Sequence, residues 1–201
     1  MFAKNASTRY PINELIGKRW SGRAYDPDRT LTSQQIITLL EAARWAPSCF
    51  GDEPWRYIVC NRVTHPAAWQ MALDALNESN RVWVSNASVM ILGFANTLMK
   101  HNGKPNRWGG YDTGAATMSL CLQATAMGMM VHQMGGYDMD KVRNGFNVPE
   151  AFTPMAILSI GYQLPVDSIP DALKEREMAP RVRRPLEENC FEASWGTPIT
   201  G

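Results

Sequence analysis

The chain has 201 residues, of which 45% are hydrophobic and 19% are charged. This composition is typical of a globular protein that can bury a sizeable core, and it argues against an intrinsically disordered chain. The formal net charge of +1 gives no electrostatic reason to expect a nucleic acid or an acidic membrane as a partner. We therefore expect one domain over residues 1–201.

The cysteines indicate a reducing compartment. No two of them form a C-x-x-C pair, and none has a metal-ligand spacing to a histidine, so we expect free thiols and no metal site. The first residues lack the apolar run of a signal peptide, and the longest apolar stretch, residues 89–95, is too short to span a membrane. We therefore expect a cytoplasmic protein. The cysteines are Cys49, Cys60, Cys121 and Cys190.

The first third of the chain predicts two helices and a strand. Apolar residues at helical spacing predict a short helix over residues 12–19. A second, amphipathic helix follows, with Thr32 or Ser33 as its cap, and Pro47 ends it. Residues 55–60 are rich in aromatic and β-branched side chains, so they predict a strand.

The rest of the chain continues this mixed pattern. Pro66 begins another helix, residues 87–95 are continuously apolar like a strand buried on both faces, and residues 100–110 are polar and rich in turn formers. Residues 113–130 predict a helix that is apolar on nearly every side, which favours burial under the fold and at a subunit interface. Residues 154–162 predict a last strand. These elements indicate a mixed layer of helices and strands.

Two short segments contain residues that are suited to binding a ligand. In an extended segment Arg19, Ser21 and Arg23 point to one side, and two guanidinium groups around a hydroxyl make a phosphate cradle. The alternative is a surface helix end with cations near its C-terminus. Gly135 and Gly136 permit close approach of the backbone to a ligand. The alternative there is an ordinary turn between two helices.

Three further features of the sequence allow more than one interpretation. Arg181 and Arg183 share a side if their segment is extended, but they lie among acidic residues, and a solvated mixed-charge tail explains that pattern too. His132 and Cys49 suggest a nucleophile and its base, yet nothing in the sequence orients them, so we assign no catalytic side chain. The sequence has no G-x-G-x-x-G after a strand, which argues against a stably bound nicotinamide cofactor.

Taken in order, these segments resemble the FMN-dependent nitroreductase family. The resemblance rests on Arg19-Trp20-Ser21-Gly22-Arg23 before an acidic-proline turn, on Ala46-Pro47-Ser48 followed by Pro54-Trp55, and on Gly136-Tyr137-Asp138. It covers residues 13–188. It implies a single nitroreductase-like domain of α+β class, with a central, mostly antiparallel sheet flanked by helices and a long buried central helix.

The resemblance also implies which residues contact FMN. The arginines bind its phosphate, with Arg184 as an alternative to Arg183, and the segment after Ala46 lies along the isoalloxazine and the ribityl chain. Backbone groups just before Gly136 cover one flavin face, and an amide there bonds N5. Gly51 and Glu53 replace residues that are often Asn and Gln. The implied contacts are Arg19, Trp20, Ser21, Arg23, Pro47, Ser48, Cys49, Gly51, Gln133, Met134, Gly135, Gly136, Arg181 and Arg183.

By the same resemblance the protein is an FMN-dependent oxidoreductase. It would transfer hydride from NAD(P)H, a transient co-substrate, to nitroaromatic, quinone or similar acceptors by a ping-pong mechanism, as a homodimer with FMN at the interface. Asn77, Trp83, Trp108 and Tyr111 are candidates for the rim of the substrate pocket, and Trp108 for a lid. Two alternatives stay open: a specialised flavin enzyme of the dehalogenase or azoline oxidase type, and a non-catalytic flavin carrier or sensor.

Overall fold

The fold is built on one antiparallel sheet. A computed structural model describes residues 4–199, in which four strands pair in the order β1-β2-β4-β3. The strands predicted at 55–60, 87–95 and 154–162 are confirmed, with shifts of one to two residues at their ends. The strands are β1 (Trp55–Asn61), β2 (Val89–Asn96), β3 (Met130–Met134) and β4 (Phe152–Gly161).

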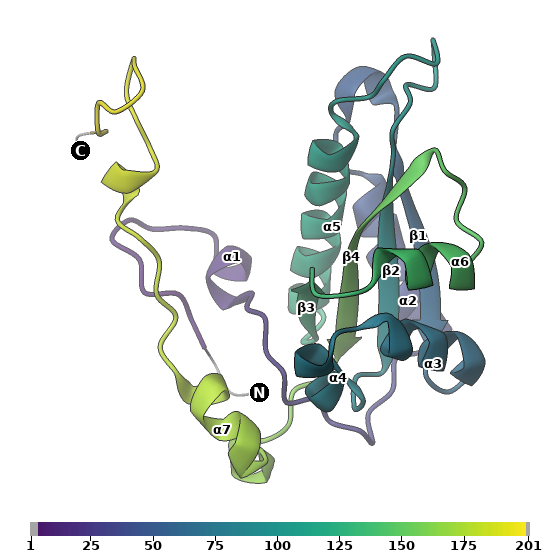
Figure 1. Cartoon of the computed structure of the whole chain (residues 1–201). Coiled ribbons are helices and arrows are strands. Elements are labelled where there is room, and N and C mark those ends of the chain that lie inside the picture. The colour runs from purple at the N-terminus through teal and green to yellow at the C-terminus, as the bar shows by residue number, and fades with distance from the viewer. Residues whose placement is uncertain (1–3, 200–201) are drawn as a thin grey trace.

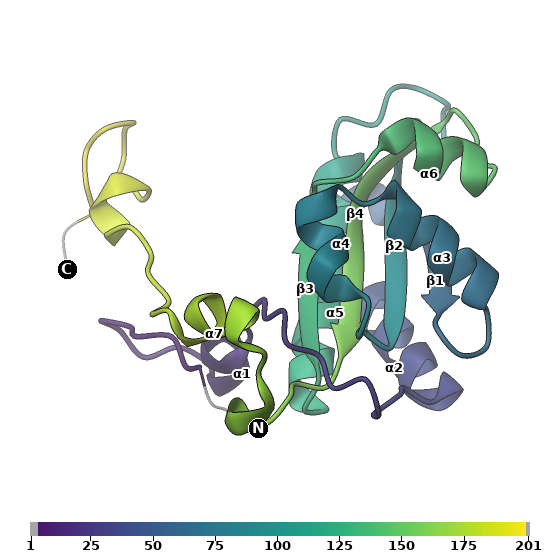
Figure 2. The same ribbon diagram turned by 60° about the horizontal axis from the view of Figure 1, so that its bottom comes forward.

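Helices cover both faces of the sheet (Figures 1 and 2). On one face α2 (Ser33–Arg44) packs against α5 (Gly109–Ala126). On the other lie α3 (Pro66–Ala75), α4 (Glu78–Val84) and α6 (Met139–Gly145). The predicted α+β class, with a central antiparallel sheet and a long central helix, is therefore confirmed.

Alternation along β2 gives each face its own core. Met90, Leu92 and Phe94 point toward α3 and α4, whereas Val89 and Ile91 point toward α2 and α5. All of these side chains are at most 2% exposed. Because helices cover both faces of the sheet, the central strand β2 must be apolar on both sides, and the continuous apolar run in the sequence meets this requirement.

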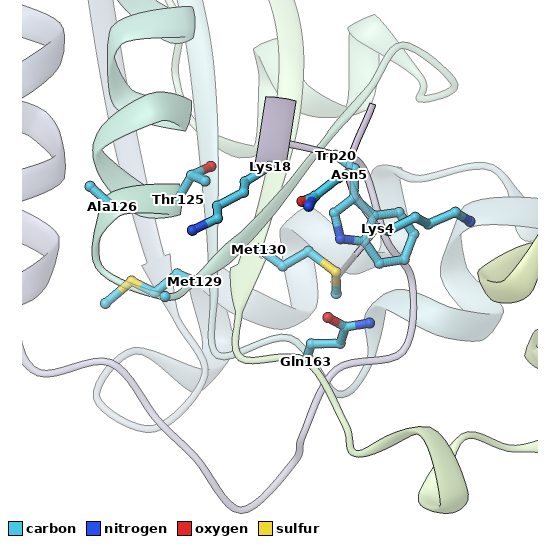
Figure 3. A pocket seen from close by; sticks show the side chains of 10 residues that line it. Lys4, Asn5, Lys18, Trp20, Thr125, Ala126, Met129, Met130 and Gln163 are labelled. Carbon is cyan, nitrogen blue, oxygen red and sulfur yellow. The ribbon is translucent and has the colours of Figure 1, made fainter. Parts of the chain in front are cut away.

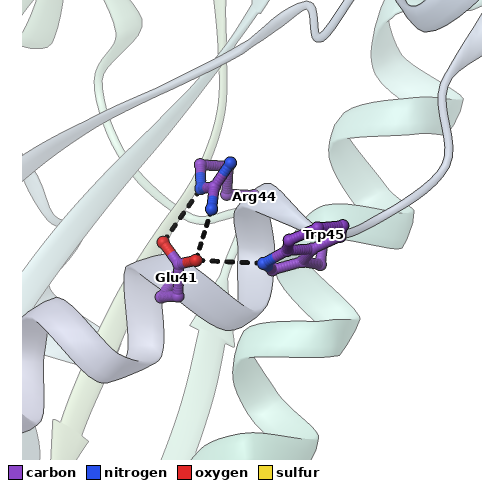
Figure 4. Close-up of polar contacts among 3 residues, drawn as sticks. All are labelled: Glu41, Arg44 and Trp45. Atoms are coloured by element: carbon purple, nitrogen blue, oxygen red, sulfur yellow. Dashed lines mark hydrogen bonds and ion pairs between the residues drawn. The ribbon is translucent and has the colours of Figure 1, made fainter.

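Both ends of α2 are fixed by side chains. The Thr32 hydroxyl accepts a hydrogen bond from the Gln35 N–H, and the Gln35 side-chain oxygen accepts one from the Thr32 N–H, so the helix begins with a capping box. At the other end the Glu41 carboxylate accepts hydrogen bonds from the Arg44 guanidinium and from the Trp45 indole (Figure 4). These contacts hold the last turn just before Pro47.

The long central helix ends earlier than the sequence indicated. The expected helix over 113–130 is wrong at its end, because α5 stops at Ala126 and Gly128 adopts a left-handed conformation with φ of +72°. Met130 instead begins β3, an edge strand that was not predicted. One side of α5 is buried, while Tyr111 and Met118 on the other side are 76% and 41% exposed.

The two ends of the chain run side by side beyond the sheet (Figures 1 and 2). The N-terminal segment contains α1 (Glu14–Lys18), which is shorter than the predicted helix over 12–19. The C-terminal segment contains α7 (Asp171–Met178). Short 3₁₀ turns are η1 (Cys49–Gly51), η2 (Val166–Ser168) and η3 (Leu186–Glu188). Within the described residues no helix is long and apolar enough to cross a membrane.

The core between α2 and the sheet should tolerate truncation poorly. Leu39 is 0% exposed, so Leu39→Ala should lower the free energy of unfolding by about 2–5 kcal/mol through lost burial and a cavity. Ile37 lies on the same helix but is 58% exposed, so Ile37→Ala should cost less than about 1 kcal/mol. Urea unfolding of both variants measures the difference, and equal losses would contradict this placement of α2.

Candidate functional site

The segment Arg19–Arg23 is extended, as its candidate role requires. Arg19 ends α1 with φ and ψ of −62° and 123°, and its guanidinium donates a hydrogen bond of 3.3 Å to the Ser21 hydroxyl. Trp20 points to the opposite side, where the Lys4 ammonium lies 4.6 Å from its ring centroid. Side chains alternate along the segment, so Arg19 and Ser21 share one side. We call this segment the cradle.

A cavity of about 360 Å³ lies on the Trp20 side of the cradle (Figure 3). Met129, Met130 and Trp20 make its walls largely apolar. Both polar atoms of the Gln163 carboxamide are enclosed, without a hydrogen-bond partner among residues 4–199. Lys18 at the rim is already paired with Glu14. The groups that suit an anion are therefore on the other side of the cradle.

A larger cavity, of about 780 Å³, opens on the Arg19 side. Its positive wall unites arginines from both ends of the chain, while Met118 and Leu122 of α5 supply an apolar wall. Burial, and then the charges of Arg19 and Arg183, hold the pKa of Arg181 below its usual value. This mutual repulsion is relieved by an anion. The arginines of the lining are Arg9, Arg19, Arg181, Arg183 and Arg184.

His132 on β3 holds the middle of the cradle. Its Nδ1 lies 3.1 Å from the Gly22 carbonyl oxygen, and its ring centroid lies 4.6 Å from that of Trp83. The pKa of His132 is lowered to about 4, chiefly by burial. The hydrogen bond to Gly22 opposes this shift, and the charges of Arg23 and Arg19 contribute to it. The ring is therefore neutral at pH 7, and Nδ1–H donates to Gly22. Both cradle arginines lie near this ring.

The Gly-Gly segment follows the end of β3, the strand whose His132 bonds to the cradle. Gln133 is exposed and donates a hydrogen bond of 3.5 Å to the Cys121 thiol of α5, and Met134 is buried. A Cβ on Gly136 would lie 2.2 Å from the Asn77 amide nitrogen, whereas a Cβ on Gly135 would meet open space. The alternative of a turn between two helices is wrong, because this segment joins β3 to α6.

The segment after α2 forms a separate, tightly bonded turn. The Cys49 backbone N–H donates to an Asp112 carboxylate oxygen at the start of α5, at 3.0 Å. The Ser48 hydroxyl accepts from the Glu53 N–H, also at 3.0 Å. Gly51 has a φ of +63° and open space beside it, and Glu53 is exposed. We call residues 47–51 the α2 turn.

One chain does not bring the cradle and the α2 turn together. The turn bonds to Asp112, while the cradle lies near Cys121, whose thiol feels the charge of Arg19. Nine residues of α5 separate these two contacts, which is about 14 Å along the helix axis. Figure 1 shows the two segments toward opposite ends of α5.

The candidate pocket residues fall in three places. Trp108 and Tyr111 lie at the start of α5, with ring centroids 6.4 Å apart. Asn77 caps α4 and donates its backbone N–H to the Gly136 carbonyl. The expectation for Trp83 is wrong, because it is 4% exposed and its ring packs against His132 and Tyr25, so it lines no rim.

The expected solvated tail is wrong at Glu177. This residue of α7 is 0% exposed, and its carboxylate accepts a hydrogen bond of 2.8 Å from the Arg23 backbone. The mixed charges around it gave no signal of burial, because the neighbouring Glu175 and Arg176 are exposed. The sequence also gives no signal for the Asp112 contact to the α2 turn, since only the fold brings those residues together.

Comparison with known proteins decides the family. A model of the nitroreductase family matches residues 16–162, which is most of the chain. The chain belongs to the nitroreductase family. The resemblance seen in the ordered segments of the sequence is thereby confirmed.

Known relatives and structures agree with this assignment. A crystal structure described as an oxidoreductase containing FMN superposes with a TM-score of 0.88 at 32% identity, covering 98% of this chain and 99% of that one. The putative NAD(P)H nitroreductase YdgI of Bacillus subtilis is 26% identical over 78% of this chain and 94% of that protein. The major NAD(P)H-flavin oxidoreductase of Aliivibrio fischeri is 30% identical over 44% of this chain and 40% of that protein. This last alignment spans less than half of the relative.

The neutral state of His132 has a measurable consequence. Its pKa of about 4 lies below the ordinary 6.5, so its stabilising contribution is complete above pH 6.5 and is lost as the pH falls toward 4. The loss amounts to at most about 3 kcal/mol. An NMR titration of the imidazole protons should show one midpoint near 4 that disappears in His132→Asn. A midpoint near 6.5 for this ring would contradict its burial against Trp83.

Proposed function

We propose that the protein is an FMN-dependent oxidoreductase that takes hydride from NAD(P)H and passes it to nitroaromatic, quinone or similar electron-poor acceptors by a ping-pong mechanism. The observation that carries the proposal is the arginine-lined cavity beside the cradle. It is supported by the family membership and by the relatives named for FMN, NAD(P)H and nitroreductase activity.

The donor set of this cavity fits FMN. A phosphate dianion suits a wall of guanidinium groups, and the cavity volume lies in the range of cofactor sites. Arg19, Arg181 and either Arg183 or Arg184, which line the cavity, would hold the phosphate. Ser21 and Arg23 would join them from the adjoining cradle, where Ser21 already bonds to Arg19. The exposed edge at Gln133 and Gly135 would face the flavin ring. When bound, FMN supplies a centre that accepts and donates hydride.

The side chains near the cavity are suited to binding rather than to covalent catalysis. Burial raises the pKa of the Cys121 thiol to about 11, so it is not a thiolate at neutral pH. The neutral His132 keeps Gly22 in place and adds no charge to the cluster of cations. One guanidinium nitrogen of Arg181 donates hydrogen bonds to the carbonyls of Lys4 and Gly17, both at 2.7 Å. These bonds anchor the C-terminal segment.

We also propose that the site is completed by a second copy of the chain. The α2 turn and the cradle contact α5 nine residues apart, at Asp112 and near Cys121, and in this proposal the partner's α2 turn reaches the cofactor that the cradle holds. Tyr111 and Met118 leave an apolar stripe on α5 open to a partner. A homodimer with FMN at the interface accounts for both observations. A cytoplasmic location belongs to this proposal, and the four cysteines are free.

The first test is the visible spectrum of the purified protein, reconstituted with FMN and mixed anaerobically with NADH or NADPH. We expect a flavin spectrum that bleaches with at least one nicotinamide and returns on adding a quinone. A flavin spectrum that no nicotinamide bleaches would favour a specialised branch with another reductant, or a carrier. A protein that cannot be reconstituted with FMN would overturn the proposal.

The shared site can be tested with two defective subunits. One carries Arg19→Met and Arg181→Met in the cradle, and the other carries Ser48→Trp in the α2 turn. Each homodimer should bind no FMN. A heterodimer, co-expressed with two affinity tags, should bind about one FMN because one complete site is restored.

The heterodimer needs two controls. Size exclusion must show that both variants remain dimers, and a wild-type dimer purified through the same two tags should bind about two FMN. A heterodimer without FMN, or a wild-type protein that is monomeric with FMN bound, would contradict a site shared between subunits.

A further inference from the structure

Glu177 is a buried acidic residue with no role in the chemistry proposed above. It lies on α7, in the C-terminal segment, yet its Oε1 accepts a hydrogen bond of 2.8 Å from the Arg23 backbone, and the Ala24 backbone also bonds to this carboxylate. We propose that Glu177 is a positioning residue that sets the affinity for FMN by holding the cradle in its binding conformation. This inference rests on the proposed function.

The C-terminal segment forms hydrogen bonds to the backbone at both ends of the cradle. Glu177 holds Arg23, the last residue of the cradle, and the Arg181 guanidinium holds the Gly17 carbonyl, two residues before its start. Glu177 and Arg181 are four residues apart in sequence, whereas Gly17 and Arg23 are six residues apart. Arg19 and Ser21 therefore lie on a short span of backbone that is fixed on either side.

Lys4 completes this arrangement. Its ammonium donates to the Glu177 carbonyl at 2.5 Å and to the Arg176 carbonyl at 3.3 Å, while its own carbonyl accepts from Arg181. The N-terminal segment is thus tied to the same helix. A shift of α7 would move the cradle and its arginines together.

The charges around Glu177 come from several elements. Lys4 and Arg23 face it and favour its ionised form, but burial is the largest influence and raises its pKa. Its neighbour Tyr25 is also fully buried. The second oxygen, Oε2, has no hydrogen-bond partner among residues 4–199. Burying a carboxylate is energetically unfavourable, and its hydrogen bonds to the backbone N–H groups of Arg23 and Ala24 compensate for this burial.

Two explanations of Glu177 predict opposite effects on FMN affinity. If the residue acted only through its charge, removing a negative charge near a phosphate site would tighten FMN binding. If it positions the cradle, removing the acceptor would leave the Arg23 and Ala24 N–H groups unpaired and weaken FMN binding. Variants of nearly equal size separate the two cases.

The experiment compares Glu177→Gln with Glu177→Met, which differ in having or lacking an acceptor. The dissociation constants of FMN and of riboflavin, which lacks the phosphate, are measured by quenching of flavin fluorescence. We expect Glu177→Met to weaken FMN binding about tenfold or more, with little change for riboflavin. Glu177→Gln should restore FMN binding to within about threefold of wild type.

Glu175→Ala is the matched control, because Glu175 lies on the same helix and is exposed. It should leave the binding of both flavins unchanged. Should Glu177→Met fail to fold, Glu177→Asp serves instead, since it keeps the charge but withdraws the carboxylate by one methylene. It should also weaken FMN more than riboflavin.

The outcomes distinguish the two proposals. Unchanged or tighter FMN binding in Glu177→Met would overturn the positioning role, and so would an equal loss of FMN and riboflavin, which would indicate a general structural defect. A wild-type protein that binds neither flavin would overturn the proposed function itself. FMN bound normally by wild type and by Glu177→Met would leave that function intact and remove only this inference.

Discussion

The crowding of like charges is the constraint on which the site depends. Arg19, Arg181 and Arg183 line one cavity although they come from opposite ends of the chain, and the pKa of Arg181 is lowered by burial and by the other two. Such a cluster is unfavourable without a counter-charge, so the fold must hold it mechanically. The backbone carbonyls of Lys4 and Gly17 hold the Arg181 guanidinium, and the buried Glu177 carboxylate holds the cradle backbone at Arg23.

The sheet and α5 serve this constraint as a frame. Pairing of β3 with β4 fixes the position of His132, whose neutral ring bonds to the Gly22 carbonyl. Helix α5 supplies the apolar wall of the cavity. The same helix holds the α2 turn through Asp112 at its other end. Within one chain these two contacts hold the cradle and the α2 turn about 14 Å apart along the axis of α5.

The sequence predicted what short-range physics determines. Thr32 with its helix, the apolar run of β2 and the extended cradle follow from capping, hydrophobic pattern and alternation. The residues of β3 continue the apolar character of α5, so only pairing with β4, which lies further along the chain, shows that they form a strand. The burial of Glu177 depends on contacts 154 residues away in sequence, which no local charge pattern records.

The C-terminal segment holds the cradle by polar contacts and leaves several apolar side chains exposed. Its contacts with the cradle are mainly polar, through Glu177 and Arg181, while Val182 and Trp195 are 75% and 92% exposed. Polar contacts alone add little net stability, and exposed apolar side chains favour a covering partner. A ligand that binds the docked conformation stabilises it by mass action. An anion bound by Arg181 in this cavity would therefore also favour docking of the C-terminal segment, because the same guanidinium bonds to the Gly17 carbonyl.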